Sequence, residues 1–209
     1  MLKPMLAGLS VLTLALVPAQ AADSPDRLYD RIVAEVVAPG FGNLASAASR
    51  HAADWQSFCA APSEVLREGL VASFNDTADR WAEVEIFRSG PSSRDFRHER
   101  FHFWPERKNA VSRGLAALRA DSAAATPAQV SAASAAVQGL PALERLIFND
   151  AHAADRCELG PAIATNAAEL AGQMQVAWTT AAPSASAESR TALATDLVTS
   201  FAIIKDSKI

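Results

Sequence analysis

The chain has 209 residues, 50% of them hydrophobic, and a formal net charge of -4 at pH 7. This length suits one domain with a buried core. The negative charge argues against nucleic acid as a partner, because phosphate binding needs a surplus of Lys and Arg. The Ala-rich composition, with a single Tyr, favours helices.

The N-terminus has the three parts of a secretory signal peptide. Lys3 provides a positive start, residues 6–17 are apolar, and Ala19-Gln20-Ala21 forms a small-residue cleavage site. We therefore predict a signal peptide over residues 1–21 and export to the periplasm. The apolar stretch is short for a membrane-spanning helix, and we expect no transmembrane segment in the mature chain.

Hydrophobic residues recur at the three- and four-residue spacing of helices along most of the chain. The Asp95–Trp104 stretch is ambiguous, and no strand pattern is evident. The pattern predicts an all-α protein, an antiparallel helical bundle. The expected helices cover residues 28–37, ended by Pro39–Gly40; 41–59; 66–84, with Ser63 as N-cap; 109–120; a short helix opened by the capping box Thr126–Gln129; 139–148; 161–178; and 184–204.

Cys59 and Cys157 are the two cysteines of the chain. In an oxidising compartment such a pair most often forms a disulfide. Closing a loop of this length contributes about 4–5 kcal/mol in the chain-entropy model. The alternative is two separate buried thiols.

Glu144 lies within a predicted apolar helix face that contains Leu140, Leu143, Ile147 and Phe148. A buried carboxylate needs a cation, a group of hydrogen-bond donors or a proton. One interpretation is a structural ion pair, with Arg88 or Arg107 as the partner. The other is a ligand-binding carboxylate, or a metal ligand, in a cleft.

Two segments of the chain resemble motifs of the imelysin-like family, also called the insulin-cleaving membrane proteases. Gly139-x-Pro141-x-x-Glu144 is similar to its Gly-x-His-x-x-Glu motif, with Pro141 where the His often stands. The stretch from Phe103 to Asn109 (FWPERKN) is similar to its Phe-Trp-Pro-Asp-like motif with following basic residues. The resemblance implies an imelysin-like helical bundle over residues 22–182 and the start of a truncated second helical region over residues 183–209.

A competing motif is His98-Glu99-x-x-His102, which has the H-E-x-x-H pattern of zinc peptidases. Two His residues on one helix face would bind zinc, and Glu99 would act as the general base. Against this, the sequence offers no third His at a suitable spacing, and Pro105 ends the segment soon after His102. The candidate metal ligands of the chain are the two histidines of this motif, His98 and His102, and the acid Glu144.

Three classes of function remain. The first, which we favour, is an exported, non-catalytic binding protein, for which the resemblance implies a cell-envelope location and, in some relatives, a link to iron uptake. Its cofactor would be a divalent metal or iron. The second is a zinc-dependent metallopeptidase. The third is a scaffold protein that binds an envelope partner, or itself, through the apolar C-terminal helix. The candidate ligand-binding residues are Glu144, Trp104, Arg107 and Arg88.

Overall fold

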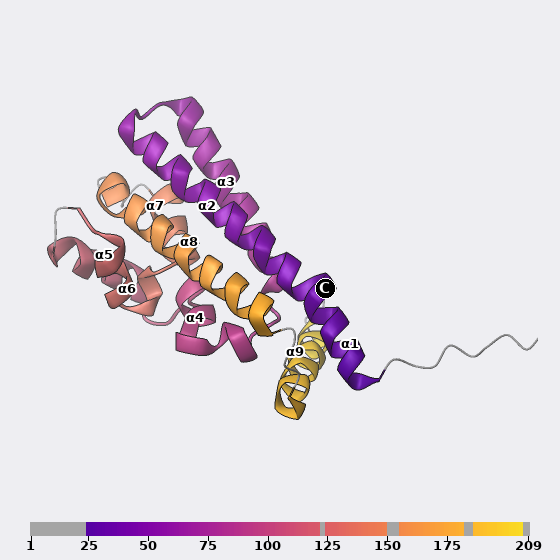
Figure 1. Ribbon diagram of the computed structural model, residues 1–209. Coiled ribbons are helices and arrows are strands. Elements are labelled where there is room, and N and C mark those ends of the chain that lie inside the picture. The colour runs from indigo at the N-terminus through magenta and orange to yellow at the C-terminus, as the bar shows by residue number, and fades with distance from the viewer. Residues whose placement is uncertain (1–23, 122–123, 150–154, 182–185, 207–209) are drawn as a thin grey trace, which may run out of the picture.

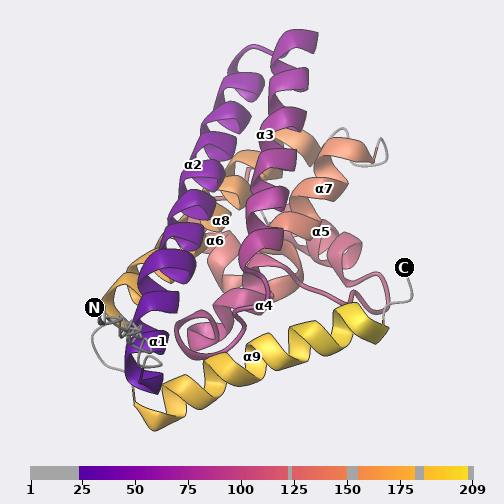
Figure 2. The same ribbon diagram turned by 90° about the vertical axis from the view of Figure 1, so that its right-hand side faces the viewer.

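The computed structural model describes residues 24–121, 124–149, 155–181 and 186–206. Within these ranges the protein is helical and has no strand. The longest helices, α2 (Ala38–Ala60), α3 (Glu64–Val84) and α8 (Arg156–Ala181), pack side by side, with α2 in contact with both others (Figures 1 and 2). The predicted all-α bundle is confirmed. The signal peptide lies outside the described residues.

The first helical stretch does not end at Pro39–Gly40 as expected. α1 (Pro25–Ile32) continues through a π-helical turn, η1 (Val33–Val37), directly into α2. The Ala38 N–H donates to the Val33 carbonyl five residues back, so the widened turn comes just before Pro39, which has no N–H to donate. A Cβ on Gly40 would lie 2.7 Å from Val84 Cγ1, so Gly40 lets α2 and α3 approach closely.

α3 follows the sequence pattern closely. The Ser63 hydroxyl accepts a hydrogen bond from the Leu66 N–H and caps the helix, as predicted. The inward-facing residues of α2, α3 and α8 form the main part of the core. Its members include Phe41, Trp55, Leu70, Phe74, Trp81, Leu170, Met174 and Trp178.

Short elements connect this layer to the remaining helices. They are η2 (Gly90–Ser92), η3 (Arg94–Phe96) and α4 (Arg97–Phe101), followed by α5 (Ala110–Asp121), α6 (Pro127–Ala132), η4 (Ala135–Val137) and α7 (Leu140–Phe148). The capping box at Thr126 and Gln129 is present at the start of α6, as predicted.

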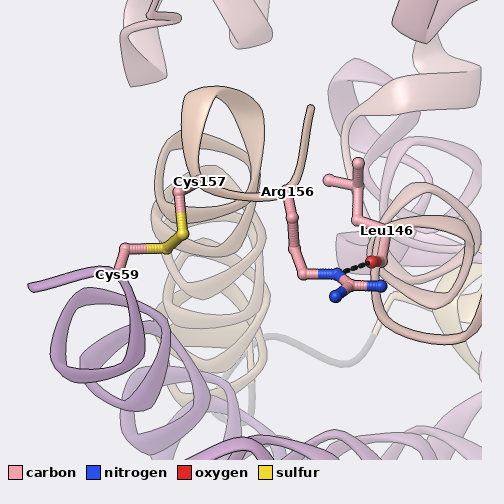
Figure 3. Close-up of a disulfide and its surroundings, with 4 residues drawn as sticks. All are labelled: Cys59, Leu146, Arg156 and Cys157. Carbon is pink, nitrogen blue, oxygen red and sulfur yellow. Dashed lines mark hydrogen bonds between the residues drawn. A yellow bond between two sulfur atoms is a disulfide. The ribbon is translucent and has the colours of Figure 1, made fainter. Parts of the chain in front are cut away.

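The predicted disulfide joins Cys59, at the end of α2, to Cys157, in the first turn of α8 (Figure 3). The neighbouring Arg156 donates from Nε to the Leu146 carbonyl at 2.6 Å. A guanidinium here satisfies a free carbonyl and complements the negative C-terminal end of α7. One short segment therefore holds α2, α7 and α8 together.

The last helix, α9 (Ala187–Asp206), crosses one end of the bundle (Figure 2). Arg190 forms an ion pair with Asp26 of α1, and Asp196 accepts hydrogen bonds from the backbone N–H and hydroxyl of Ser89. Of the predicted apolar stripe, Leu193 is buried, whereas Phe201 is 70% exposed. Leu197 is half-buried, and the side chain of Ile204 is outside the described residues.

One described helical stretch, Pro25–Ala60, is long and apolar enough to cross a bilayer by length and composition alone. We expected no such run beyond the N-terminus. Most of this stretch is α2, which contacts α3 and α8, and core helices often meet the same two criteria.

Candidate functional site

The segment between α3 and α5 carries the Phe-Trp-Pro motif and has an irregular backbone. Four of its non-glycine residues, Asp95, Phe96, Lys108 and Asn109, have φ angles between 53° and 56°. Such left-handed conformations are unfavourable for side chains with a Cβ and tend to occur at functional sites. The Trp104–Pro105 peptide bond is cis.

The Gly-x-Pro-x-x-Glu motif begins at a point of close backbone contact. A Cβ on Gly139 would lie 2.1 Å from the Phe101 carbonyl oxygen and 2.8 Å from the Phe101 Cα. Only glycine fits at this distance. Pro141 follows in the first turn of α7, where its missing N–H is not needed. The backbone at the start of the Gly-x-Pro-x-x-Glu motif therefore touches the end of α4, two residues before the Phe-Trp-Pro motif begins.

A polar network joins the same two segments through Arg145, the residue after the motif glutamate. Arg145 Nη2 donates to Glu106 Oε2 at 2.7 Å, and Nη1 donates to the Ser112 hydroxyl at 2.9 Å and to Asn109 Oδ1 at 3.3 Å. The other oxygen of Glu106 accepts from the Val111 N–H at 2.9 Å, in the first turn of α5. We call these four side chains, Glu106, Asn109, Ser112 and Arg145, the motif junction.

The sequence did not predict this junction. The Glu106 side chain is only 19% exposed and that of Arg145 31%. The two residues are 39 positions apart, and no local sequence pattern links positions so distant.

The expected burial of Glu144 is wrong. Leu140, Leu143 and Ile147 are buried as predicted, but Leu146 is buried too, which rotates the buried face of α7 away from Glu144. Glu144 and Phe148 consequently lie on the exposed side. Within the described ranges, no hydrogen bond or ion pair of the Glu144 carboxylate is found.

The expected partners of Glu144 are also exposed. Arg88 and Arg107 lie on the surface, and neither forms an ion pair with Glu144. Trp104 is 71% exposed, and its ring stacks on that of His102, with centroids 6.4 Å apart and planes 7° apart. Trp104 is thus a surface residue of the motif segment and not part of the packed core.

The H-E-x-x-H residues do not form a zinc helix. α4 ends at Phe101, and His102 has an extended conformation, so His98 and His102 do not share a helix face. His98 is buried against Trp81 with ring centroids 4.7 Å apart, and its Nε2 bonds the Glu85 carbonyl at 2.8 Å. Burial lowers the pKa of both His98 and His102. Among the described residues, no three His, Cys, Asp or Glu side chains are grouped to hold a metal, so His98, His102 and Glu144 do not form a ligand set.

His51 is a further histidine with partners that the sequence did not indicate. Its Nε2 accepts from Trp55 Nε1 at 3.0 Å, and its Nδ1 lies 2.9 Å from the Ser73 hydroxyl. Because Nε2 accepts, Nδ1 carries the proton and donates to Ser73, so this nitrogen cannot act as a base toward the serine. Burial lowers the pKa of His51 to about 4. The cluster joins α2 to α3 and has a structural role.

Comparison with known proteins agrees with the resemblance seen in the sequence. The chain is similar in structure to an imelysin-like protein from Psychrobacter arcticum 273-4, with a TM-score of 0.77, 19% sequence identity and 88% of this chain covered. At this identity the match shows the fold. The aligned region spans 62% of the length of that protein. No curated protein matches the chain.

The family model described as imelysin, Peptidase M75, matches residues 37–209. This region contains both motif segments, the motif junction and the disulfide. The chain therefore belongs to the imelysin family.

Proposed function

We propose that this protein is exported to the periplasm and acts there as a non-catalytic binding protein of the cell envelope. The resemblance that links some imelysin-like relatives to iron uptake makes iron or another metal the first cargo to test. In this proposal the exposed part of the motif segments, with Trp104 and Glu144, contacts the partner or cargo.

This proposal rests on the observation that polar side chains around the motifs already make structural contacts. Arg145 and Glu106 bind each other and hold the backbone, and His98 is buried against Trp81. These groups are engaged in structural contacts, whereas catalysis would require a base or metal ligands free to meet substrate. Trp104 and Glu144 remain accessible to a partner.

Peptidase activity is the competing function, because the letters of the H-E-x-x-H motif are complete. The purified mature chain, incubated with zinc, should not cleave insulin B chain or casein faster than the Glu99→Gln variant does. Zinc-dependent cleavage that is lost in Glu99→Gln and in His98→Ala would overturn the non-catalytic assignment.

Export and metal binding are tested separately. Residues 1–30 fused to a reporter enzyme that is active only in the periplasm should give activity, and the N-terminus of the processed chain should begin at Ala22. A cytoplasmic, unprocessed fusion would contradict the location. Iron and zinc content, measured on the purified chain and on Glu144→Gln and Trp104→Ala, shows whether the exposed motif residues take part in holding metal.

A further inference from the structure

A cavity of about 180 Å³ lies between α9, the end of α8 and the turn at η2. It is apart from the motif junction, and the two share no residue. Apolar side chains from three elements line it, and so do several polar groups. Its lining includes Tyr29, Ser89, Arg94, Trp178, Leu193 and Asp196.

Trp178, the largest apolar side chain of the cavity, is held by a hydrogen bond and by ring packing. Trp178 donates from Nε1 to the Ser92 hydroxyl at 2.8 Å, and its ring stacks on Phe41 with centroids 6.0 Å apart. Gly90, with φ of 60°, lies beside the edge of the indole, and a Cβ there would be in van der Waals contact with it at 3.8 Å. A cavity of about 150 Å³ lined by apolar side chains can hold benzene, so this one is large enough for a single ring or a short aliphatic chain.

The polar part of the cavity carries an uncommitted positive charge. Arg94 lines the cavity and also a shallow groove along α8, which Arg97 and Glu169 line as well. Within the described part of the chain, no hydrogen bond or ion pair of the Arg94 side chain is found. Arg97 donates from Nη2 to Asp95 at 3.1 Å, while its buried Nε has no partner. A planar guanidinium with free N–H groups is suited to binding a carboxylate.

The acidic residue of the cavity is already engaged. Both oxygens of Asp196 accept hydrogen bonds from Ser89, at 2.9 Å and 2.8 Å. Burial raises the pKa of Tyr29, whose hydroxyl bonds Ser189, so Tyr29 stays neutral. Arg94 is therefore the charged group of the cavity whose hydrogen-bonding atoms are not already used within the described residues.

We propose that this cavity binds a small carboxylic acid, whose carboxylate is held by Arg94 and whose apolar body lies against Trp178 and Leu193. The inference goes beyond the proposed function, because it assigns a second site with its own residues. It stands or falls independently of export, metal binding and peptidase activity.

The test is a protein-detected NMR titration of the purified chain, following the indole N–H signal of Trp178, which the Trp178→Phe variant identifies. The probes are benzoate, hexanoate, benzylamine and inorganic phosphate. Benzoate or hexanoate should bind saturably, and Arg94→Gln should weaken this binding by about tenfold or more, since a charge-assisted hydrogen bond is lost. Arg113→Gln, at an exposed arginine of α5 that does not line the cavity, serves as the matched control and should bind normally.

Ala192→Leu tests the apolar body, because it fills the cavity from α9 and should abolish binding while leaving Arg94 in place. Absence of any saturable shift with the two acids up to about 10 mM, a concentration that reveals even weak ligands, would overturn the proposal. So would benzylamine binding as well as benzoate, which would make Asp196 the selecting charge. Inorganic phosphate binding as tightly as benzoate would equally overturn it, because the site would then bind any oxyanion without using the apolar cavity.

Discussion

The layer of α2, α3 and α8 and the irregular segment between α3 and α5 are held in place by different forces. In the layer, apolar residues at helical spacing are buried together, and the backbone is regular. In the irregular segment, four residues have left-handed conformations, and side chains fix the backbone through Glu106, Arg145 and His98. Both family motifs meet in the second region. The comparison indicates that a family motif can mark a place where side chains hold backbone segments together, as well as a reactive site.

The disulfide is the strongest single constraint on the helical layer. Changing both Cys59 and Cys157 to Ala should lower the free energy of unfolding by about 4 kcal/mol, because the bridge closes a long loop in the unfolded chain. Urea unfolding of the variant, and of the reduced wild type, measures this loss. A change below about 1 kcal/mol would mean that burial alone holds the layer together.

A substitution at Gly139 tests the packing of the irregular region through its effect on the free energy of unfolding. Gly139→Ala should cost about 3 kcal/mol, because the new Cβ overlaps rigid backbone at Phe101. Gly69→Ala in α3 is the matched control, since nothing lies within 4 Å of its added Cβ, and it should stabilise the protein by about 0.5–1 kcal/mol. If both variants are equally stable, Gly139 is not in tight contact with the Phe101 backbone.

The buried His51 makes the stability of the helical layer depend on pH. Its pKa is lowered from 6.5 to about 4 by burial. Between these values the unfolded chain binds a proton that the folded protein does not, so stability falls as the pH falls from 6.5 toward 4. The loss should reach about 2–3 kcal/mol near pH 4.5.

Urea unfolding at neutral pH and near pH 4.5 measures this effect, with His51→Gln as the control. The variant has no titrating group at this position and should lose correspondingly less on acidification. Equal losses in the two proteins would show that His51 is protonated in the folded state.

Glu144 should have the smallest effect on stability. Because its carboxylate is exposed, Glu144→Gln should change the free energy of unfolding by less than about 0.5 kcal/mol. Thermal unfolding of the two proteins gives the answer. A loss of several kcal/mol would restore the original expectation of a buried, paired acid.

The regular helices could be predicted from the sequence because local periodicity determines their faces. The cap at Ser63 and the box at Thr126 followed from residue type and spacing alone. Pro39 misled us because a proline can follow a π-helical turn within one continuous helix. Glu144 was misplaced because Leu146 was left out of the apolar face, although it is one of its most buried members.

The irregular region could not be derived in the same way. A left-handed Phe96 has no sequence signal, since this conformation favours Gly, Asn and Asp. The bonds from Arg145 to Glu106 and from His51 to Ser73 join residues 39 and 22 positions apart, and only the folded chain shows such pairs. One clue was available: a charged Arg145 directly follows the motif glutamate.

A double-mutant cycle on Arg145 and Glu106 tests the motif junction most directly. Arg145→Met, Glu106→Gln and the double variant should give a coupling energy of about 1.5 kcal/mol or more, as expected for a partly buried, charge-assisted pair. The exposed pair Arg80–Glu83 in α3 is the control and should give about 0.5 kcal/mol or less. A coupling at Arg145–Glu106 no larger than that of the control would contradict the claim that these side chains lock the two motif segments together.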